Sequence, residues 1–447
     1  MRMLLRILGV LVVLGLIAGG FLAWSLSRAS AVQAGPVTSV AAARTLLNPI
    51  PDGPDAARLR HGQYLVRMGD CLSCHLRAGG EPFAGGLGLN TPFGVIYSSN
   101  ISSDPNQGIG SWTPDQFYRA MHDGIGGHGQ HLYPAFPYPW FRNLSRDDDD
   151  ALLAYLKTTP PVAYQPPGNA LIFPMNIRAS VSVWNLISLK QQPTAQPPQG
   201  APPEWSRGEA LVRGPGHCSA CHTPRNLLGA DKTSRDFQGG LLDNFVAPDL
   251  TGNARTGLGR WSVDDITEYL RTGRNARAAA GGPMGDVVTY STSMISDEDR
   301  HAIAVYLKSL PASADADVPT PDAAAMKRGA AIFSDACTAC HLENAVGQPT
   351  VFPPLGNNAV AQQNDPTSVL HIILAGVRVG PSPSRPSPLT MPSFAWKLTD
   401  QQVADVSTYV RNSWGNRAAP VTAAQVTKLR GKLQLDKERL TDNSGDR

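Results

Sequence analysis

The most apolar part of the chain is its beginning. Residues 7–27 contain no charged side chain, and two arginines precede them. As a helix these 21 residues, at about 1.5 Å each, would span about 31 Å, the thickness of a membrane. We therefore expect residues 1–28 to form a transmembrane anchor with its N-terminus in the cytoplasm and the rest of the chain outside. A cleavable signal segment is the alternative, because Ala29-Ser30-Ala31 offers a small-x-small cleavage site.

Further along, apolar positions recur with helical spacing in three successive stretches that repeat one order of features. Each opens with a helix that contains a glycine, namely Gly62, Gly208 or Gly329. A second helix follows and ends at a glycine. A last helix begins at a serine or threonine cap. The expected second helices are 113–123, 262–272 and 366–375, and the expected caps are Ser145 with Asp148, Ser296 with Asp299, and Thr399 with Gln402.

Proline-rich joints separate these stretches, and the pattern predicts a mainly α chain rich in loops. The predicted parts are an anchor or signal segment (1–28), a tether (29–54), domain 1 (55–160), a proline-rich linker with a packed apolar segment (161–202), domain 2 (203–311), a linker (312–321), domain 3 (322–415) and a tail (416–447). Residues 169–190 are too apolar for a plain linker. We expect them to pack back onto the first domain or onto a partner.

All six cysteines fall in one pattern, C-x-x-C-H, which occurs once in each stretch. The copies are Cys71, Cys74 and His75; Cys218, Cys221 and His222; and Cys337, Cys340 and His341. This pattern attaches a c-type haem: two thiols form thioethers with the porphyrin, and the histidine becomes the proximal ligand of the iron. A thioredoxin-like redox pair or half a zinc site would not explain the histidine in every copy. We therefore expect three covalently bound haem c groups.

Composition agrees with haem-binding domains. Glycine (43) and proline (38) are abundant and only 17% of the residues are charged, as expected where irregular loops surround a flat apolar cofactor. The formal charge of +3 excludes a strongly basic nucleic-acid binder. We expect an asparagine turn near each haem edge and a tyrosine of each last helix packed against the porphyrin. These residues are Asn100, Asn253 and Asn357, and Tyr155, Tyr306 and Tyr409.

A six-coordinate haem that transfers electrons also needs a distal ligand, and methionine raises the reduction potential of the iron. Met284 lies eleven residues after the glycine that ends the second helix of its stretch, and Met391 lies fifteen residues after its counterpart. Both precede the final capped helix, in predicted loops. We interpret them as distal ligands.

The first stretch differs, because the matching position is Phe136, which cannot bind iron. The candidates are Met175 in the apolar segment, His131 and His128 beside the position, and Met121 in the preceding helix. We favour Met175 over His131, and an open iron site is the third alternative. The remaining histidines are interpreted as surface or satisfied residues; they are His61, His122, His217, His301 and His371.

Several longer segments carry a family resemblance. They are Gly214-Pro215-Gly216-His217-Cys218, Thr223-Pro224-Arg225, residues 256–262, Asp286-Val287-Val288 and Tyr290-Ser291-Thr292. With the three motifs and the export segment, they resemble the trihaem cytochrome c subunits of membrane-bound bacterial dehydrogenases, most closely those of quinohaemoprotein alcohol dehydrogenases. The resemblance implies tandem class I cytochrome c domains and Met284 and Met391 as axial ligands. The alcohol dehydrogenase members read Tyr-Pro-Ala-Met-Pro-Tyr where this chain has Phe136.

The resemblance also implies that the chain takes electrons from a catalytic subunit with PQQ, a flavin or a molybdenum cofactor. It would pass them to ubiquinone or an oxidase, with the bulk of the chain in the periplasm beside the inner membrane. A haem enzyme with an open first iron, peroxidase-like with His128 or His131 as acid and base, is the alternative from another class. A cytochrome subunit of a terminal oxidase is a third hypothesis.

Overall fold

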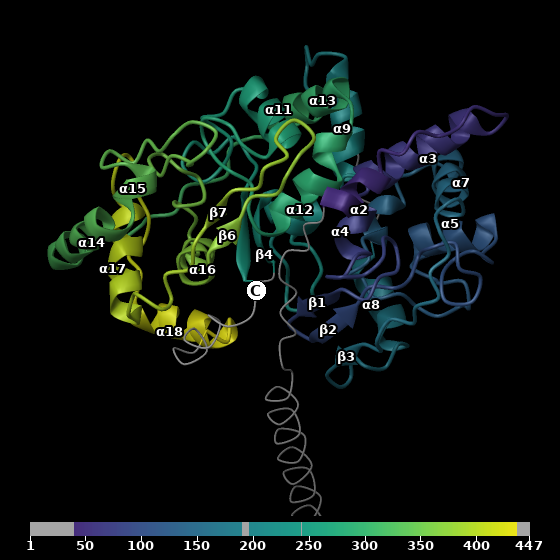
Figure 1. Cartoon of the computed structure of the whole chain (residues 1–447), viewed down its shortest axis with the longest axis horizontal. Coiled ribbons are helices and arrows are strands. Elements are labelled where there is room, and N and C mark those ends of the chain that lie inside the picture. Colours follow the sequence, from purple (N-terminus) through teal and green to yellow (C-terminus); the bar gives the residue numbers. More distant parts are fainter. Residues whose placement is uncertain (1–39, 190–195, 243, 436–447) are drawn as a thin grey trace, which may run out of the picture.

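The computed structural model describes residues 40–189, 196–242 and 244–435. They form three helical units in a row along the longest axis, from unit 1 in blue through unit 2 in teal and green to unit 3 in green and yellow (Figure 1). The prediction of a mainly α chain is confirmed. No helix in the described ranges combines the length and apolarity that a membrane crossing requires, and the span predicted at 7–27 lies outside them.

Each unit is built on two crossing helices. The pairs are α3 (Ala56–Met68) with α7 (Arg146–Leu156), α9 (Glu204–Arg213) with α13 (Asp297–Lys308), and α14 (Ala323–Ala336) with α17 (Asp400–Val410). A Cβ at Gly62 would overlap the carbonyl oxygen of Ala151, and one at Gly208 would overlap that of Ala302. The glycine in each first helix is therefore the point of closest approach between the two backbones.

The tyrosines of the last helices belong to these crossings, and their expected packing against a porphyrin stays a prediction. The ring of Tyr306 meets that of Trp205 edge-on at 5.2 Å, and its hydroxyl accepts a hydrogen bond from Arg213 Nε at 2.6 Å. Tyr409 packs against Phe333. A tyrosine one turn beyond the crossing point fills the angle between two helices, so packing between the helices accounts for its recurrence in the three units.

The second helices form where predicted: α5 (Pro114–Asp123), α11 (Val263–Thr272) and α16 (Thr367–Ala375). Gly124 and Gly273 end the first two with φ of 64° and 71°, the left-handed conformation that glycine adopts most easily. Capping boxes form at Ser145 and Thr399. At Ser296 the serine caps its helix, but the carboxylate of Asp299 turns instead to Arg207 and Tyr64.

Short elements complete the units. The attachment helices are α4 (Cys71–Cys74), α10 (Ser219–His222) and α15 (Thr338–His341). Three small antiparallel sheets comprise β1 (Gly88–Thr91), β2 (Gly94–Tyr97) and β3 (Ala170–Leu171); β4 (Gln238–Leu242) and β5 (Phe245–Asp249); and β6 (Val377–Arg378) and β7 (Thr390–Met391). The other helices are α2 (Val40–Thr45), α6 (Tyr138–Phe141), α8 (Ser180–Ser188), α12 (Pro283–Tyr290), α18 (Ala423–Lys432) and the 3-10 turns η1 (Thr233–Arg235) and η2 (Thr292–Met294).

Parts predicted as tether and tail pack onto the units. Within the tether, α2 buries Ala42 and Ala43, and Leu46 is fully buried in the core of unit 1. Within the tail, α18 buries Val426 and Leu429 against unit 3. Apolar side chains at helical spacing explain both contacts.

The apolar segment after unit 1 folds back onto that unit. Strand β3 pairs with β2, with Gly94 opposite Leu171. The hydroxyl of Tyr138 donates to Asn185 Oδ1 in α8 at 2.6 Å. These contacts place residues 170–188 over the loop that contains Phe136, and this placement shapes the first haem site.

Candidate haem sites

Each of the three motif histidines makes the same type of hydrogen bond, from Nδ1 to a backbone carbonyl oxygen. Nδ1 of His75 lies 2.6 Å from the carbonyl oxygen of Ser99, Nδ1 of His222 lies 2.7 Å from that of Pro248, and Nδ1 of His341 lies 3.1 Å from that of Pro353. A carbonyl only accepts, so Nδ1 carries the proton and the lone pair is on Nε2, which is the tautomer that a metal needs. Burial lowers the pKa of all three histidines, which keeps the imidazoles neutral.

The carbonyl acceptors have a constant position in the chain. Ser99, Pro248 and Pro353 each stand five residues before a side chain that closes a turn. The turn residues are Asp104, Asn253 and Asn358, whose Oδ1 atoms accept from the backbone N–H groups two and three residues on. The sequence prediction grouped Asn253 with Asn100 and Asn357. Asn100 does lie in a turn at the cavity, where its Oδ1 accepts from the Ser102 N–H, but Asp104 and Asn358 are the residues equivalent to Asn253. The distance from the motif varies between units, but the spacing of five does not.

The six cysteine thiols are free and partly or wholly buried. Burial raises the pKa of Cys71, Cys74 and Cys218 to about 12 and that of Cys221 and Cys337 to about 11. Protonated thiols are poor ligands for zinc. Within the described part of the chain, no group of three or more His, Cys, Asp or Glu side chains is placed to hold a metal ion. The donors therefore suit thioether attachment better than a zinc cluster.

A cavity of about 2040 Å³ adjoins the first motif. Its lining includes Cys71, Cys74 and His75 of unit 1 together with Cys221 of unit 2 and Met391 of unit 3. Pockets for one drug-sized ligand measure about 300–1,000 Å³, so this space is large enough for a porphyrin and continues between the units.

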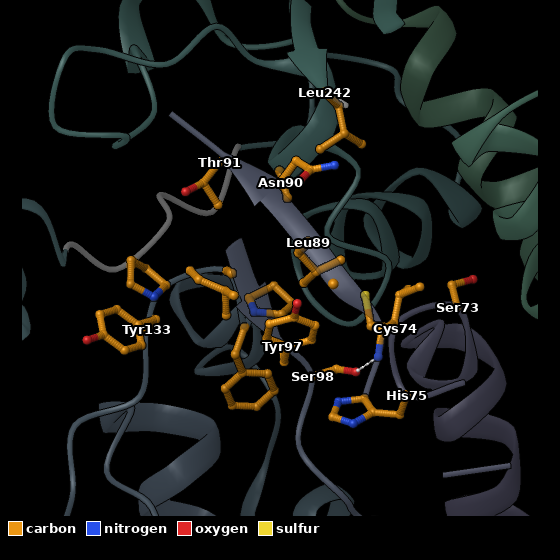
Figure 2. Close-up of a pocket in the computed structure, with 18 of the residues that line it drawn as sticks. Ser73, Cys74, His75, Leu89, Asn90, Thr91, Tyr97, Ser98, Tyr133 and Leu242 are labelled. Carbon is orange, nitrogen blue, oxygen red and sulfur yellow. Dashed lines mark hydrogen bonds between the residues drawn. The ribbon is translucent and has the colours of Figure 1, made fainter. Parts of the chain in front are cut away.

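Figure 2 shows side chains from several segments around the cavity. Cys74 and His75 lie at one side and Tyr133 lies across from them, with Leu89 of β1 between them and Leu242 of β4 above. Mostly apolar walls, with the neutral imidazole of His75 beside the thiols of Cys71 and Cys74, match a flat, apolar, iron-bearing group. The residues present therefore fit haem c.

The methionines predicted as distal ligands of units 2 and 3 lie in regular elements, which corrects their assignment to loops. Met284 is in the first turn of α12, and Met391 pairs with Val377 in the β6–β7 ladder and lines the cavity. A bridge between Gly281 and Val379 brings the two methionine segments side by side. Their roles as ligands stay predictions.

For the first site, the structure separates the candidates. Met175, His128, Met121 and Phe136 line the cavity, whereas His131 is not among the described lining residues. The carbonyl oxygen of Met175 accepts a hydrogen bond from the hydroxyl of Tyr133 at 2.8 Å, which holds the methionine segment against this loop. Met121 is otherwise buried in the core of unit 1. These contacts place Met175 at the cavity, and its role as distal ligand stays a prediction.

His217, which was interpreted as a surface or satisfied residue, is satisfied, but the sequence did not show its place between units 1 and 2. It is partly buried and lines the cavity, with Nε2 3.3 Å from the carbonyl oxygen of Gly69 and its ring 5.5 Å from that of Phe141. Burial lowers its pKa, so the side chain is neutral. Its position directly before Cys218 was the available signal.

Comparison with known proteins agrees with these sites. The cytochrome c family matches residues 206–311 and 326–414, which contain the second and third motifs. The cytochrome c subunit of the quinone alcohol dehydrogenase of Gluconacetobacter polyoxogenes is 40% identical over 408 residues, 87% of each chain. The gluconate 2-dehydrogenase cytochrome c subunit of Pantoea cypripedii is 40% identical over 400 residues, 85% of this chain and 91% of its own.

A third relative, the fructose dehydrogenase cytochrome subunit of Gluconobacter japonicus, is 33% identical over 413 residues, 86% of this chain and 84% of its own. The similarity therefore covers most of each protein, including the region of unit 1. Haem attachment geometry and similarity along the whole chain lead to one conclusion. This chain belongs to the family of dehydrogenase cytochrome c subunits, which bind haem c covalently and transfer electrons.

Proposed function

We propose that the chain carries three haem c groups in tandem class I cytochrome c domains and transfers electrons from a dehydrogenase catalytic subunit to an acceptor at the membrane. One observation carries the proposal: the hydrogen bond from Nδ1 of the motif histidine to a backbone carbonyl, repeated in all three units. A bound haem supplies reversible one-electron exchange at its iron.

Each group of residues has a definite task in this proposal. The cysteines hold the porphyrin edge, the carbonyls of Ser99, Pro248 and Pro353 fix the tautomer, and burial keeps water away. The proposed proximal ligands are His75, His222 and His341, and the proposed distal ligands are Met175, Met284 and Met391. The paired histidine and methionine favour reversible reduction over reaction with small molecules, because no coordination position stays open.

The partner is a dehydrogenase that oxidises an alcohol, aldehyde or sugar. Relatives named as subunits of alcohol, gluconate and fructose dehydrogenases support this class. The catalytic subunit would carry PQQ, a flavin or a molybdenum cofactor, and the acceptor would be ubiquinone or an oxidase. The uncharged run at 7–27 supports an anchor in the inner membrane, with the haem units in the periplasm.

Reduction experiments test this function. The purified chain, mixed anaerobically with an alcohol, aldehyde or sugar, should stay oxidised, and its haems should be reduced once the catalytic subunit is added. Pyridine haemochrome titration should give three haems per chain and about two for Cys221→Ser. Reduction by a substrate without the partner would overturn the electron-transfer role, and a wild-type value of one or two would overturn the trihaem assignment.

The first haem also separates this proposal from a peroxidase-like enzyme with an open iron. Met175→Ala should convert one haem to a high-spin form and remove about one third of the red absorbance of iron–methionine bonds. His131→Ala is the matched control and should leave that band unchanged. If Met175→Ala has no effect and the wild-type haem 1 is already high-spin, the enzyme hypothesis replaces the proposed one for this site.

A further inference from the structure

Exposed apolar side chains gather on one part of the molecule. Eight of the thirteen large apolar residues that are exposed in the described ranges lie in residues 173–187, in the loop after the second motif, or on β4. They are Phe173, Ile177, Val183, Leu186, Ile187, Leu227, Leu228 and Leu241. A single exposed leucine needs no explanation, but a contiguous group of this size marks an interaction surface.

Helix α8 is the centre of this group. No charged residue occurs between Arg178 and Lys190, and Val181 alone is buried among the described residues of the helix. Leu186 is 87% exposed. The helix also contains polar residues such as Ser182 and Asn185, but its exposed face carries Val183, Leu186 and Ile187. Apolar side chains that gather on one face of a helix normally pack against a neighbour, and the described residues leave this face uncovered.

Contacts join α8 to unit 2. The indole Nε1 of Trp184 donates to the carbonyl oxygen of Leu228 at 2.8 Å, so the loop with Leu227 and Leu228 lies against the helix. Five residues are at once exposed and part of the cavity lining, and we call them the apolar rim: Val183, Ile187, Leu227, Leu228 and Leu241. The rim therefore lies at the edge of the cavity that contains the first motif.

We infer that the apolar rim rests on the surface of a lipid bilayer. Its members are aliphatic, whereas protein interfaces are anchored by Trp, Tyr and Arg, with Leu and Val under-represented. Arg178 and Arg225 line the cavity beside the rim and suit anionic headgroups. In Figure 1, α8 lies on the same side of unit 1 as the β1–β2 pair, at the edge of the molecule.

Chain length agrees with this placement. The uncharged run ends at residue 27, thirteen residues before Val40, where the described chain begins. Thirteen extended residues reach at most about 45 Å. If the run lies in a bilayer, Val40 is held within that distance of its surface, and the rim offers the adjoining units an apolar contact with that surface. The inference thus rests on the proposed membrane location and adds the orientation.

Site-specific labelling of the full-length protein tests the orientation. Thioether formation consumes all six native cysteines, so one introduced cysteine is a unique thiol for an environment-sensitive fluorophore. Ile187→Cys and Leu227→Cys report on the rim. Val346→Cys in unit 3 is the matched control, since Val346 is 53% exposed, Ile187 is 57% exposed, and Val346 is outside the described cavity lining. Each labelled protein is reconstituted into vesicles that contain anionic lipid.

Fluorophores at 187 and 227 should shift to shorter wavelength and be quenched by nitroxides on the lipid acyl chains, and the fluorophore at 346 should do neither. Vesicle-bound protein with no quenching at 187 or 227 would overturn the inference and leave the membrane location intact. Protein that does not float with the vesicles would overturn the membrane location itself. Shielding at 187 and 227 only after addition of the catalytic subunit would make the rim a protein interface and also overturn the inference.

Discussion

The interface between units 1 and 2 differs in kind from the interface between units 2 and 3. At the first, the apolar cores merge: Tyr290 and Met294 of unit 2 belong to the core of unit 1, and Met68 of unit 1 belongs to the core of unit 2. At the second, the described core of unit 3 contains residues of that unit alone. Units 1 and 2 share their hydrophobic stabilisation, whereas unit 3 has its own.

Polar contacts take the place of a shared core between units 2 and 3. Buried Arg255 donates from Nη1 to the carbonyl oxygen of Gln362 at 2.8 Å and from Nε to Asp315 at 3.0 Å. Arg274, also buried, donates from Nη2 to the carbonyl oxygen of Ser387 at 3.0 Å. Each such bond contributes only about 1 kcal/mol net, but leaving its buried partner unsatisfied costs more. These contacts therefore fix orientation more than they add stability.

The second haem site also contacts its two neighbouring units through different elements. Its attachment motif contacts unit 1, where Trp140 Nε1 donates to Ser219 Oγ at 2.6 Å. Its methionine helix contacts unit 3, where Thr289 Oγ1 donates to the carbonyl oxygen of Pro381 at 3.0 Å. The comparison predicts a rigid pair of units with a third unit held by directional bonds.

The largest expected effect follows from Tyr290→Ala, which would open a cavity in the shared core. Tyr290 is 1% exposed, and loss of a buried aromatic side chain costs about 3–5 kcal/mol. Segment-resolved amide hydrogen exchange should show lower opening free energies in both unit 1 and unit 2. Phe333→Ala, 2% exposed in the core of unit 3, is the control and should affect unit 3 alone. An effect of Tyr290→Ala confined to unit 2 would contradict a shared core.

A smaller effect is expected at the polar interface. Arg255→Ala would leave two backbone carbonyls without their donor and remove one donor from Asp315, which keeps the hydrogen bond from Asn253, at a cost of about 2 kcal/mol. Hydrogen exchange should rise where units 2 and 3 meet and stay unchanged in unit 1. Arg260→Ala, which removes an exposed arginine of the same loop, should change little. Equal effects of both substitutions would mean that the buried arginine does not hold the interface.

The contact between Trp140 and Ser219 should have a still smaller effect. Trp140→Phe removes the N–H donor and leaves the ring, so about 1 kcal/mol should be lost. A double-mutant cycle with Ser219→Ala isolates the coupling. The bond from Trp205 Nε1 to Ser309 Oγ, 2.7 Å within unit 2, is the matched control pair. Only the first cycle should change the exchange rates of unit 1.

Local patterns made much of each unit predictable. The cysteines, histidines, glycine crossings and helix caps are set by neighbours in sequence, and the predicted second helices match to within one residue. The equivalent turn residues, Asp104 and Asn358, were missed where loop length varies between units. In unit 3 the turn residue follows His341 by seventeen positions, and in unit 2 it follows His222 by thirty-one. Fixed spacing from the motif therefore fails there.

Contacts between units were not predictable from the sequence. Met68 and Tyr290 read as ordinary core residues of their own helices, and nothing local shows that the cores merge. Asp299 read as half of a capping box, but Arg207 and Tyr64 compete for its carboxylate. The hydrogen bonds of this side chain are made with partners 92 and 235 residues away in the sequence, and no local pattern specifies such partners.

Acid should weaken the interface of units 1 and 2 slightly, through Asp299. Burial opposes its ionisation, but hydrogen bonds from Arg207 and Tyr64 outweigh this and lower the pKa of Asp299. A carboxyl whose folded pKa lies below its unfolded value of about 3.9 stabilises the fold above that pH, and the contribution is lost as pH falls through the folded pKa. Urea midpoints of the first two units should therefore decline below about pH 4.

Tyr64→Phe sharpens this test, because it keeps the ring and removes the hydroxyl of unit 1 that donates to Asp299 and accepts from the Ser296 N–H. The folded pKa of Asp299 should then move back toward its usual value. The variant should therefore have a lower free energy of unfolding at pH 6, and that free energy should fall less on acidification than in the wild type. Tyr97→Phe, in β2 of the same unit, is the control and should follow the wild-type curve. Parallel curves of stability against pH for wild type and Tyr64→Phe would show that Arg207 alone lowers the pKa of Asp299. Tyr64 would then join the two units by packing, and the polar part of their interface would be independent of pH.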